Sequence, residues 1–110
     1  MNIGTAIRSI RKELNIPQKQ LAVDCGISQT FLSGIENGAR RPSPKTMQRI
    51  CTVMDIPEML VYIMAMHEKD VPTSKRHVYS LVYPSIVHLA MQMVSTDHAD
   101  MVKRKDIREK

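Results

Sequence analysis

The sequence predicts an all-α protein, with a five-helix unit in residues 1–66 followed by one or two C-terminal helices. Two observations lead to this prediction. Apolar residues recur at steps of three and four along most of the chain, which is the period of an amphipathic helix. Glycine, proline and asparagine interrupt this pattern at short intervals, and the sequence lacks the alternation of apolar and polar residues that is typical of strands.

The first two helices are expected over residues 3–14 and 17–25. Asn2 is placed to cap the first helix, and Pro17 follows its end. Gly26 closes the second helix, because glycine adopts the left-handed conformation without a Cβ clash. The inward positions of these two helices are Ile3, Ile7, Ile10, Leu14, Leu21, Ala22 and Cys25.

Serine residues are placed to cap the third and fourth helices, at Ser28 and Ser43. The third helix is expected to end at Asn37 and Gly38, and Pro57 separates the fourth helix from the fifth. The apolar positions of these three helices are Phe31, Leu32 and Ile35, then Met47, Ile50, Cys51 and Met54, then Met59, Leu60, Ile63 and Met64.

The C-terminal part begins with a polar stretch from His67 to Ser74 and continues as an apolar stripe at helical spacing. Pro84 lies inside this stripe. Because a proline in a helix interior costs about 3 kcal/mol, we expect either a kink there or the start of a new helix. The sequence thus divides into a domain over residues 1–66, a helical segment over 67–96, and a polar, mobile tail over 97–110.

The net charge of +5 is unevenly distributed along the 110 residues. Residues 1–66 carry eight Lys or Arg against five Asp or Glu, and residues 103–110 carry five against two, whereas residues 67–102 carry three against four. A basic excess of this kind favours a polyanionic partner. Cys25 and Cys51 lie within apolar helical patterns, which predicts buried thiols in a reducing cytoplasm rather than a disulfide.

The segment from Leu21 to Ser43 contains two helices joined by a short turn with a glycine, which is the pattern of a helix-turn-helix. If Ile27, Leu32 and Ile35 point inward, the opposite face is polar and carries no carboxylate. Gln is suited to paired hydrogen bonds with adenine in the major groove, and Arg is suited to phosphate contacts. The polar face consists of Gln29, Thr30, Ser33, Gly34 and Asn37, and the phosphate contacts are expected from Arg40 and Arg41.

These residues resemble the lambda-repressor-like (Cro/CI, Xre-type) helix-turn-helix family of transcriptional regulators. The resemblance is carried by the pattern Q-x-x-L-A-x-x-x-G-I-S-x-x-x-L-S-x-I-E-x-G-x-R-x-P-S, and it extends over about residues 3–66. It implies a structural ion pair between Arg11 and Glu36. It also implies base reading by Gln29, Thr30, Ser33 and Gly34, and backbone contacts by Gln18, Asn37, Gly38 and Arg40.

Two positions depart from the family pattern. Gly34 stands where the family often has a further base-reading side chain, so either fewer bases are read directly or the backbone approaches the groove more closely. Pro17 stands where Ser or Thr commonly caps the second helix, and the missing cap costs about 1 kcal/mol.

The C-terminal stripe has two interpretations. It either folds back on the five-helix unit as core or self-associates, and we expect self-association because Val87 and Met91 widen its apolar surface. The segment is too short to enclose a separate cavity, so no small-molecule ligand is expected. The dimer interface is predicted at Val78, Leu81, Val82, Ile86, Leu89, Ala90, Met93 and Val94.

The sequence therefore predicts a cytoplasmic, sequence-specific transcriptional regulator, a repressor that binds an inverted repeat in double-stranded DNA as a homodimer. An alternative is an antitoxin-like or adaptor protein whose C-terminal helices bind another protein. An enzyme is not expected, because no motif links Ser, His and Asp. The four His share no ligand-like spacing with either Cys, so neither a metal nor a cofactor is expected. No apolar run reaches the roughly 18 residues of a membrane span, so no membrane partner is expected.

Overall fold

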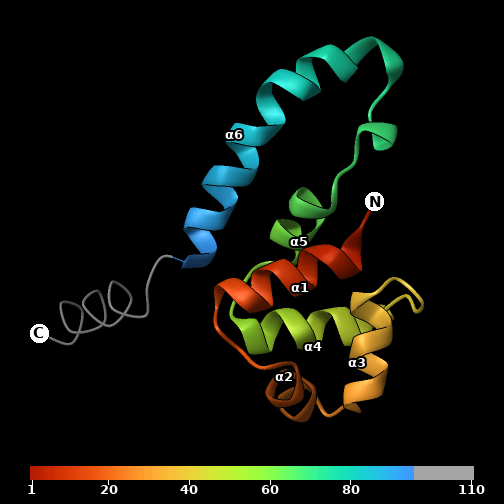
Figure 1. Cartoon of the computed structure of the whole chain (residues 1–110), viewed down its shortest axis with the longest axis vertical. Helices are drawn as coiled ribbons and strands as arrows, with labels where there is room; N and C mark the ends of the chain where they lie inside the picture. Colours follow the sequence, from red (N-terminus) through yellow and green to blue (C-terminus); the bar gives the residue numbers. More distant parts are fainter. Residues whose placement is uncertain (96–110) are drawn as a thin grey trace, which may run out of the picture.

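The computed structural model describes residues 1–95, which contain six α-helices and two short 3₁₀ helices (Figure 1). The α-helices are α1 (Ile3–Glu13), α2 (Gln18–Cys25), α3 (Gln29–Glu36), α4 (Pro44–Met54), α5 (Glu58–Ala65) and α6 (Arg76–Ser95). The 3₁₀ helices η1 (Glu68–Asp70) and η2 (Thr73–Lys75) connect α5 to α6. This part of the chain contains no strand, so the all-α prediction is confirmed for it. The predicted tail over residues 97–110 lies outside the described residues.

Helices α1 to α5 enclose one hydrophobic core. Helix α1 packs against α3 and α5, while α2 packs against α3 and α4. Both predicted serine caps are present: the hydroxyls of Ser28 and Ser43 accept backbone N–H bonds of 3.0 and 3.1 Å at the starts of α3 and α4. The largest fully enclosed side chains are Ile7, Ile10, Leu21, Leu32, Ile35, Ile50 and Val61.

The start of α1 differs from the sequence prediction. Asn2 occupies the N-cap position, but its side chain makes no capping hydrogen bond. Its backbone N–H instead donates to the carbonyl oxygen of Ala65 over 2.9 Å. The first residues of α1 are therefore held by the end of α5, a contact between segments that are far apart in the sequence.

Helix α5 also presents a different inner face from the predicted one. The sequence favoured Met59 as an inward residue, but Met59 is 66% exposed, whereas Val61 and Ala65 are buried. Nearly every residue of α5 is apolar, so periodicity alone does not define which face is inside. Packing against α1 decides the orientation.

Helix α6 runs through Pro84 without interruption, which excludes a new helix starting there. Pro84 and Ser80 are both exposed, so the Ser80 carbonyl that loses its helical N–H partner can be solvated. Although α6 spans 20 residues, neither it nor any other helix within residues 1–95 is long and apolar enough to cross a membrane.

Helix α6 folds back on the five-helix unit along one side. Figure 1 shows the connecting segment leading away from the bundle and α6 returning, so that its C-terminal half reaches α1. Ala90 and Val94 are each 5% exposed and belong to the core. The Tyr83 hydroxyl donates to the carbonyl oxygens of Ile63 (2.8 Å) and Met64 (3.1 Å), at the end of α5.

This packing corrects the predicted dimer interface. Ala90 and Val94 cannot contribute to such an interface, because they are buried in the core of their own chain. The sequence could not separate them from the rest of the stripe, since the apolar arc of α6 is wider than one contact face. The six other predicted positions are between 40% and 67% exposed, and they are Val78, Leu81, Val82, Ile86, Leu89 and Met93.

The two cysteines are free and buried, on α2 and α4. Burial raises the pKa of the Cys51 thiol to about 11, and burial also raises the pKa of Cys25. Both side chains therefore remain neutral thiols at physiological pH and act as small apolar residues of the core.

Candidate nucleic-acid interface

The turn between α2 and α3 sets the direction in which α3 projects. Gly26 ends α2 in the left-handed conformation with φ of 69°, and the N–H of Ile27 donates to the carbonyl oxygen of Ala22 over 3.0 Å. Leu32 and Ile35 are 0% and 1% exposed, so they fix the inner face of α3. On the other side of α3, Gln29 and Thr30 are exposed, and Ser33 and Gly34 are half-buried.

The solvent face of α3 forms the floor of an open depression. Most of the residues predicted to contact DNA lie together there, although they come from α2, α3 and the loop after α3. Arg40 is the only charged residue of the lining, and no carboxylate borders the depression within the described residues. The lining residues are Gln18, Gln29, Thr30, Ser33, Gly34, Asn37 and Arg40.

A chain of hydrogen bonds links this surface to the interior. Glu36 Oε2 accepts from Arg11 Nε over 2.8 Å, and Glu36 Oε1 accepts from Arg11 Nη2 over 3.0 Å. The same Oε1 accepts from Gln18 Nε2 over 3.1 Å, and Gln18 Oε1 accepts from Gln29 Nε2 over 3.2 Å. Glu36 is the only acidic residue of α3. It is 5% exposed and paired with Arg11, which keeps its charge away from the solvent face of the helix.

Arg40 is held in place by two residues of α3. Its backbone N–H donates to the carbonyl oxygen of Gly34 over 3.0 Å, and its guanidinium carbon lies 5.6 Å from the centre of the Phe31 ring. A Cβ on Gly34 would lie 3.4 Å from the Cγ and Cδ of Arg40. A side chain at position 34 would therefore make ordinary van der Waals contact with the stem of Arg40, a proximity that the sequence did not indicate.

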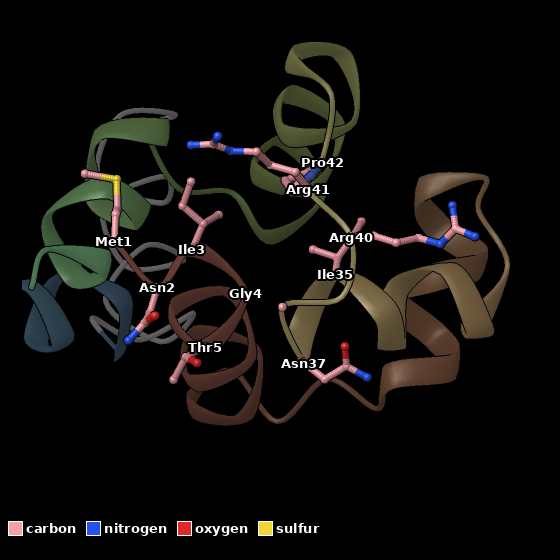
Figure 2. Close-up of a pocket in the computed structure, with 11 residues that line it drawn as sticks. Met1, Asn2, Ile3, Gly4, Thr5, Ile35, Asn37, Arg40, Arg41 and Pro42 are labelled. Carbon is pink, nitrogen blue, oxygen red and sulfur yellow. The ribbon is translucent and has the colours of Figure 1, made fainter.

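The next arginine in the chain takes a different direction. In Figure 2, Arg40 points toward α2 and α3, whereas Arg41 points the opposite way, over the start of α1. Figure 2 shows a separate pocket, which lies between the first residues of α1 and the loop after α3. Gly38 and Arg41 line this pocket, together with Asn37 and Arg40. The structure therefore does not bring Arg41 and Gly38 into the depression that Gln29 occupies.

Gly4 is a residue of structural importance that the sequence analysis missed. At this point α1 crosses the C-terminal end of α3, and a Cβ on Gly4 would overlap the Ile35 carbonyl oxygen and lie 2.9 Å from that of Glu36. A glycine inside an otherwise regular apolar stripe, away from any turn, was the available signal. This close crossing fixes the C-terminal end of α3 relative to α1.

The polar groups of the described residues bear on two kinds of site, metal centres and nucleic-acid interfaces. No group of three His, Cys, Asp or Glu side chains within residues 1–95 could hold a metal ion. The hydrogen-bonding groups of the depression are amides, hydroxyls and one guanidinium. Such groups recognise base edges and phosphates.

The comparison with known families decides what kind of unit α1 to α5 form. A helix-turn-helix family model matches residues 7–60. This unit belongs to the lambda-repressor-like helix-turn-helix family. The match includes α2 and α3, the helices that form the depression, and it leaves α6 outside.

Curated proteins from a phage and a bacterium are similar to part of this chain. The chain is 41% identical over 54 residues to the ImmF control region 10 kDa protein of Bacillus phage phi105, covering 49% of this chain and 60% of that protein. It is 35% identical over 77 residues to the HTH-type transcriptional repressor RghR of Bacillus subtilis, covering 64% and 57% respectively. The matched part therefore spans less than two thirds of either relative.

A solved structure shares the fold. The clp gene regulator ClgR from Corynebacterium glutamicum superposes with a TM-score of 0.60 at 21% sequence identity, over 78% of this chain and 92% of that one. This likeness concerns the arrangement of helices, and it supports the all-α helix-turn-helix architecture independently of the sequence matches.

Proposed function

We propose that this protein is a transcriptional repressor that binds an inverted-repeat operator in double-stranded DNA as a homodimer. The observation that carries the proposal is the polar depression over α3, which lacks a carboxylate and joins Gln29 to Arg40. The relative RghR is named a transcriptional repressor, which supports the sign of regulation. Such a regulator needs no catalytic group or cofactor, and it would act in the cytoplasm.

Base reading is assigned to the exposed side of α3. In helix-turn-helix proteins the first residues of the second helix contact base edges in the major groove. Gln29 and Thr30 stand in the first turn of α3, and Ser33 follows one turn later. A Gln side chain can pair with the N6 and N7 positions of adenine, so we expect Gln29 to select an A·T pair.

Phosphate contacts are assigned to the rim of the depression. Gln18 lies at the N-terminus of α2, and Asn37 and Arg40 follow the end of α3, so these groups flank the base-reading residues on both sides. Gly38 and Arg41 border the neighbouring pocket at the start of α1. They would contact the DNA backbone beside the groove that the depression faces.

Substitutions of Gln29 and Arg40 separate base reading from phosphate binding. Gln29→Ala should cost roughly 1–3 kcal/mol on the preferred site and relax selection at one base pair. Arg40→Ala should weaken binding to all sequences about equally and reduce the salt slope by about one. Selection of bound sequences from random DNA, followed by titrations at several salt concentrations, measures both effects. If both variants lost affinity uniformly with unchanged sequence preference, Gln29 would not be a base-reading residue.

The homodimer is assigned to the exposed apolar face of α6. Val78, Val82, Ile86, Leu89 and Met93 follow one another at steps of three and four, and each is at least 40% exposed. The sequence from residue 77 to residue 95 contains no Lys, Arg, Asp or Glu. Two copies of this basic protein can therefore bring these faces together without opposing like charges, and a two-fold contact buries the same patch on both.

The proposed dimer constrains the symmetry and the half-site spacing of the operator. Two α3 helices that enter successive major grooves on one face of DNA must lie about 34 Å apart. The selected site should then be an inverted repeat with half-sites about one helical turn apart. Sedimentation of the intact protein at micromolar concentration gives the assembly state. A monomer that becomes dimeric only with a second protein would favour the adaptor alternative, and a site without two-fold symmetry would contradict the dimeric repressor.

A further inference from the structure

The hydrogen-bonded chain from Arg11 to Gln29 has a direction that its chemistry imposes. It starts at the buried carboxylate of Glu36, which is held by two hydrogen bonds from Arg11 (2.8 and 3.0 Å). It continues through Gln18 and ends at the exposed amide of Gln29. A buried ion pair is thereby connected to the side chain assigned to base reading.

A carboxylate accepts hydrogen bonds and cannot donate them while it is charged. Gln18 must therefore turn its NH₂ group toward Glu36, which leaves its carbonyl oxygen facing α3. Only a donor can meet that oxygen, so Gln29 turns its own NH₂ group toward Gln18. Rotating the Gln18 amide by half a turn would place its oxygen 3.1 Å from a charged oxygen, where both groups are acceptors.

We propose that the Arg11–Glu36 pair is a specificity-determining pair that acts through Gln18 on Gln29. It sets the orientation in which the Gln29 amide offers its carbonyl oxygen and one remaining N–H to DNA. Adenine presents one donor and one acceptor in the major groove and matches that pair of groups, whereas guanine presents two acceptors. The inference rests on the proposed function, because it requires Gln29 to read a base.

Glu36 and Arg11 are positioning residues in this account, since neither borders the depression. A merely structural ion pair would affect the stability of the fold and leave the choice of base unchanged. A pair that orients the Gln29 amide would affect the choice of base even in a folded variant. The preference between adenine and guanine at one position distinguishes these two roles.

The sharpest test allows residue 36 and Gln18 to remain hydrogen-bonded but no longer fixes which of them is the donor. In the double variant Arg11→Met with Glu36→Gln, the uncharged amide at position 36 can accept from or donate to Gln18. Replacing both partners avoids leaving an unpaired buried charge, as Glu36→Gln alone would do. The base pair read by Gln29 is first located as the one at which Gln29→Ala relaxes selection, and dissociation constants are then measured with A·T and with G·C at that position.

We expect the wild-type protein to prefer A·T over G·C by about tenfold or more, in line with a paired base contact. In the double variant this ratio should fall to about threefold or less, because either amide orientation is then accessible. Gln18→Leu, which keeps the ion pair and removes the link, should lower the ratio similarly. Gln20→Ala is the matched control, since Gln20 lies on the same helix and bonds Asp24 over 2.8 Å outside the chain.

Circular dichroism verifies that each variant is folded before its DNA affinity is measured. If the double variant does not fold, Gln18→Leu decides the question, because it leaves the buried pair intact. An undiminished ratio in a folded variant, with Gln29→Ala still abolishing selection, would overturn this inference and leave the proposed function standing. A wild-type protein without any base preference would overturn both.

Discussion

Helices α3 and α6 each bury one side against the rest of the chain, but their exposed sides differ in chemistry. The exposed side of α3 carries amides and hydroxyls, some of them already hydrogen-bonded to neighbours. The exposed side of α6 carries aliphatic side chains, with Leu89 60% and Met93 64% exposed. The first surface suits a polar partner such as DNA, and the second suits another apolar surface.

The two helices also differ in how firmly they are held. α3 is fixed from behind by the close crossing with α1 at Gly4 and by the buried Arg11–Glu36 pair. α6 is held by Ala90 and Val94 in the core and by tyrosine hydroxyls on the end of α5. Under the proposed function, the firmly held helix α3 is the one that reads base edges, and the exposed side of α6 gains support when a second copy binds.

The largest effect is expected where α1 crosses α3. Gly4→Ala adds a Cβ that overlaps the carbonyl oxygen of Ile35, and backbone on both sides must move to accept it. We expect a loss of about 3 kcal/mol in the free energy of unfolding, at the upper end for overpacking. Denaturant unfolding followed by circular dichroism measures it.

Gly34→Ala is the matched substitution on the front of α3. Its Cβ would meet the flexible stem of Arg40 at 3.4 Å, and Gly34 has an ordinary helical conformation. We expect a stability change within about 1 kcal/mol, because the helix propensity of alanine offsets the crowding. Equal losses in the two variants would mean that the crossing with α1 does not hold α3 in place.

An intermediate effect is expected on the exposed side of α6. Leu89→Glu places a carboxylate in the proposed dimer contact of each copy, and we expect the dimer to weaken by at least about thirtyfold, as for a central contact residue. The fold should be retained, because Leu89 is 60% exposed in the protomer. Sedimentation equilibrium measures the dissociation constant.

Ser80→Glu serves as the control for that substitution. Ser80 is exposed and lies nine residues before Leu89, which is about two and a half helical turns. The two side chains therefore lie on opposite sides of α6. The carboxylate introduced at position 80 should leave the dissociation constant of the dimer unchanged. A similar weakening by both substitutions would point to net charge rather than to the apolar face.

The smallest effect concerns the attachment of α6 to α5. Tyr83→Phe removes the hydroxyl that donates to the Ile63 and Met64 carbonyl oxygens, and we expect a loss of about 1 kcal/mol in stability. Tyr79→Phe keeps the stacking of the two tyrosine rings, whose centroids are 4.6 Å apart. It removes a single hydrogen bond of 3.1 Å to the Met66 carbonyl oxygen, which is more exposed than the bonds of Tyr83. Thermal unfolding should show the smaller loss for Tyr79→Phe, and the reverse order would contradict the attachment through Tyr83.

The sequence by itself determined the helices of the N-terminal unit and the face that α3 exposes. Local chemistry was sufficient there: Ser28 and Ser43 start helices, Gly26 closes one, and apolar residues at helical spacing point inward. In α5 and α6 the same spacing was ambiguous, because apolar residues occupy too much of each helix to single out one side.

Only the tertiary structure decided which apolar residues of the C-terminal helix are buried in the core and which remain exposed. It placed Ala90 and Val94 in the core, left Leu89 exposed, and turned Arg40 and Arg41 to opposite sides. It also joined Glu36 to Gln18, which are 18 positions apart. Contacts of this kind depend on how helices cross, and crossing is set by the whole core rather than by the spacing within any one segment.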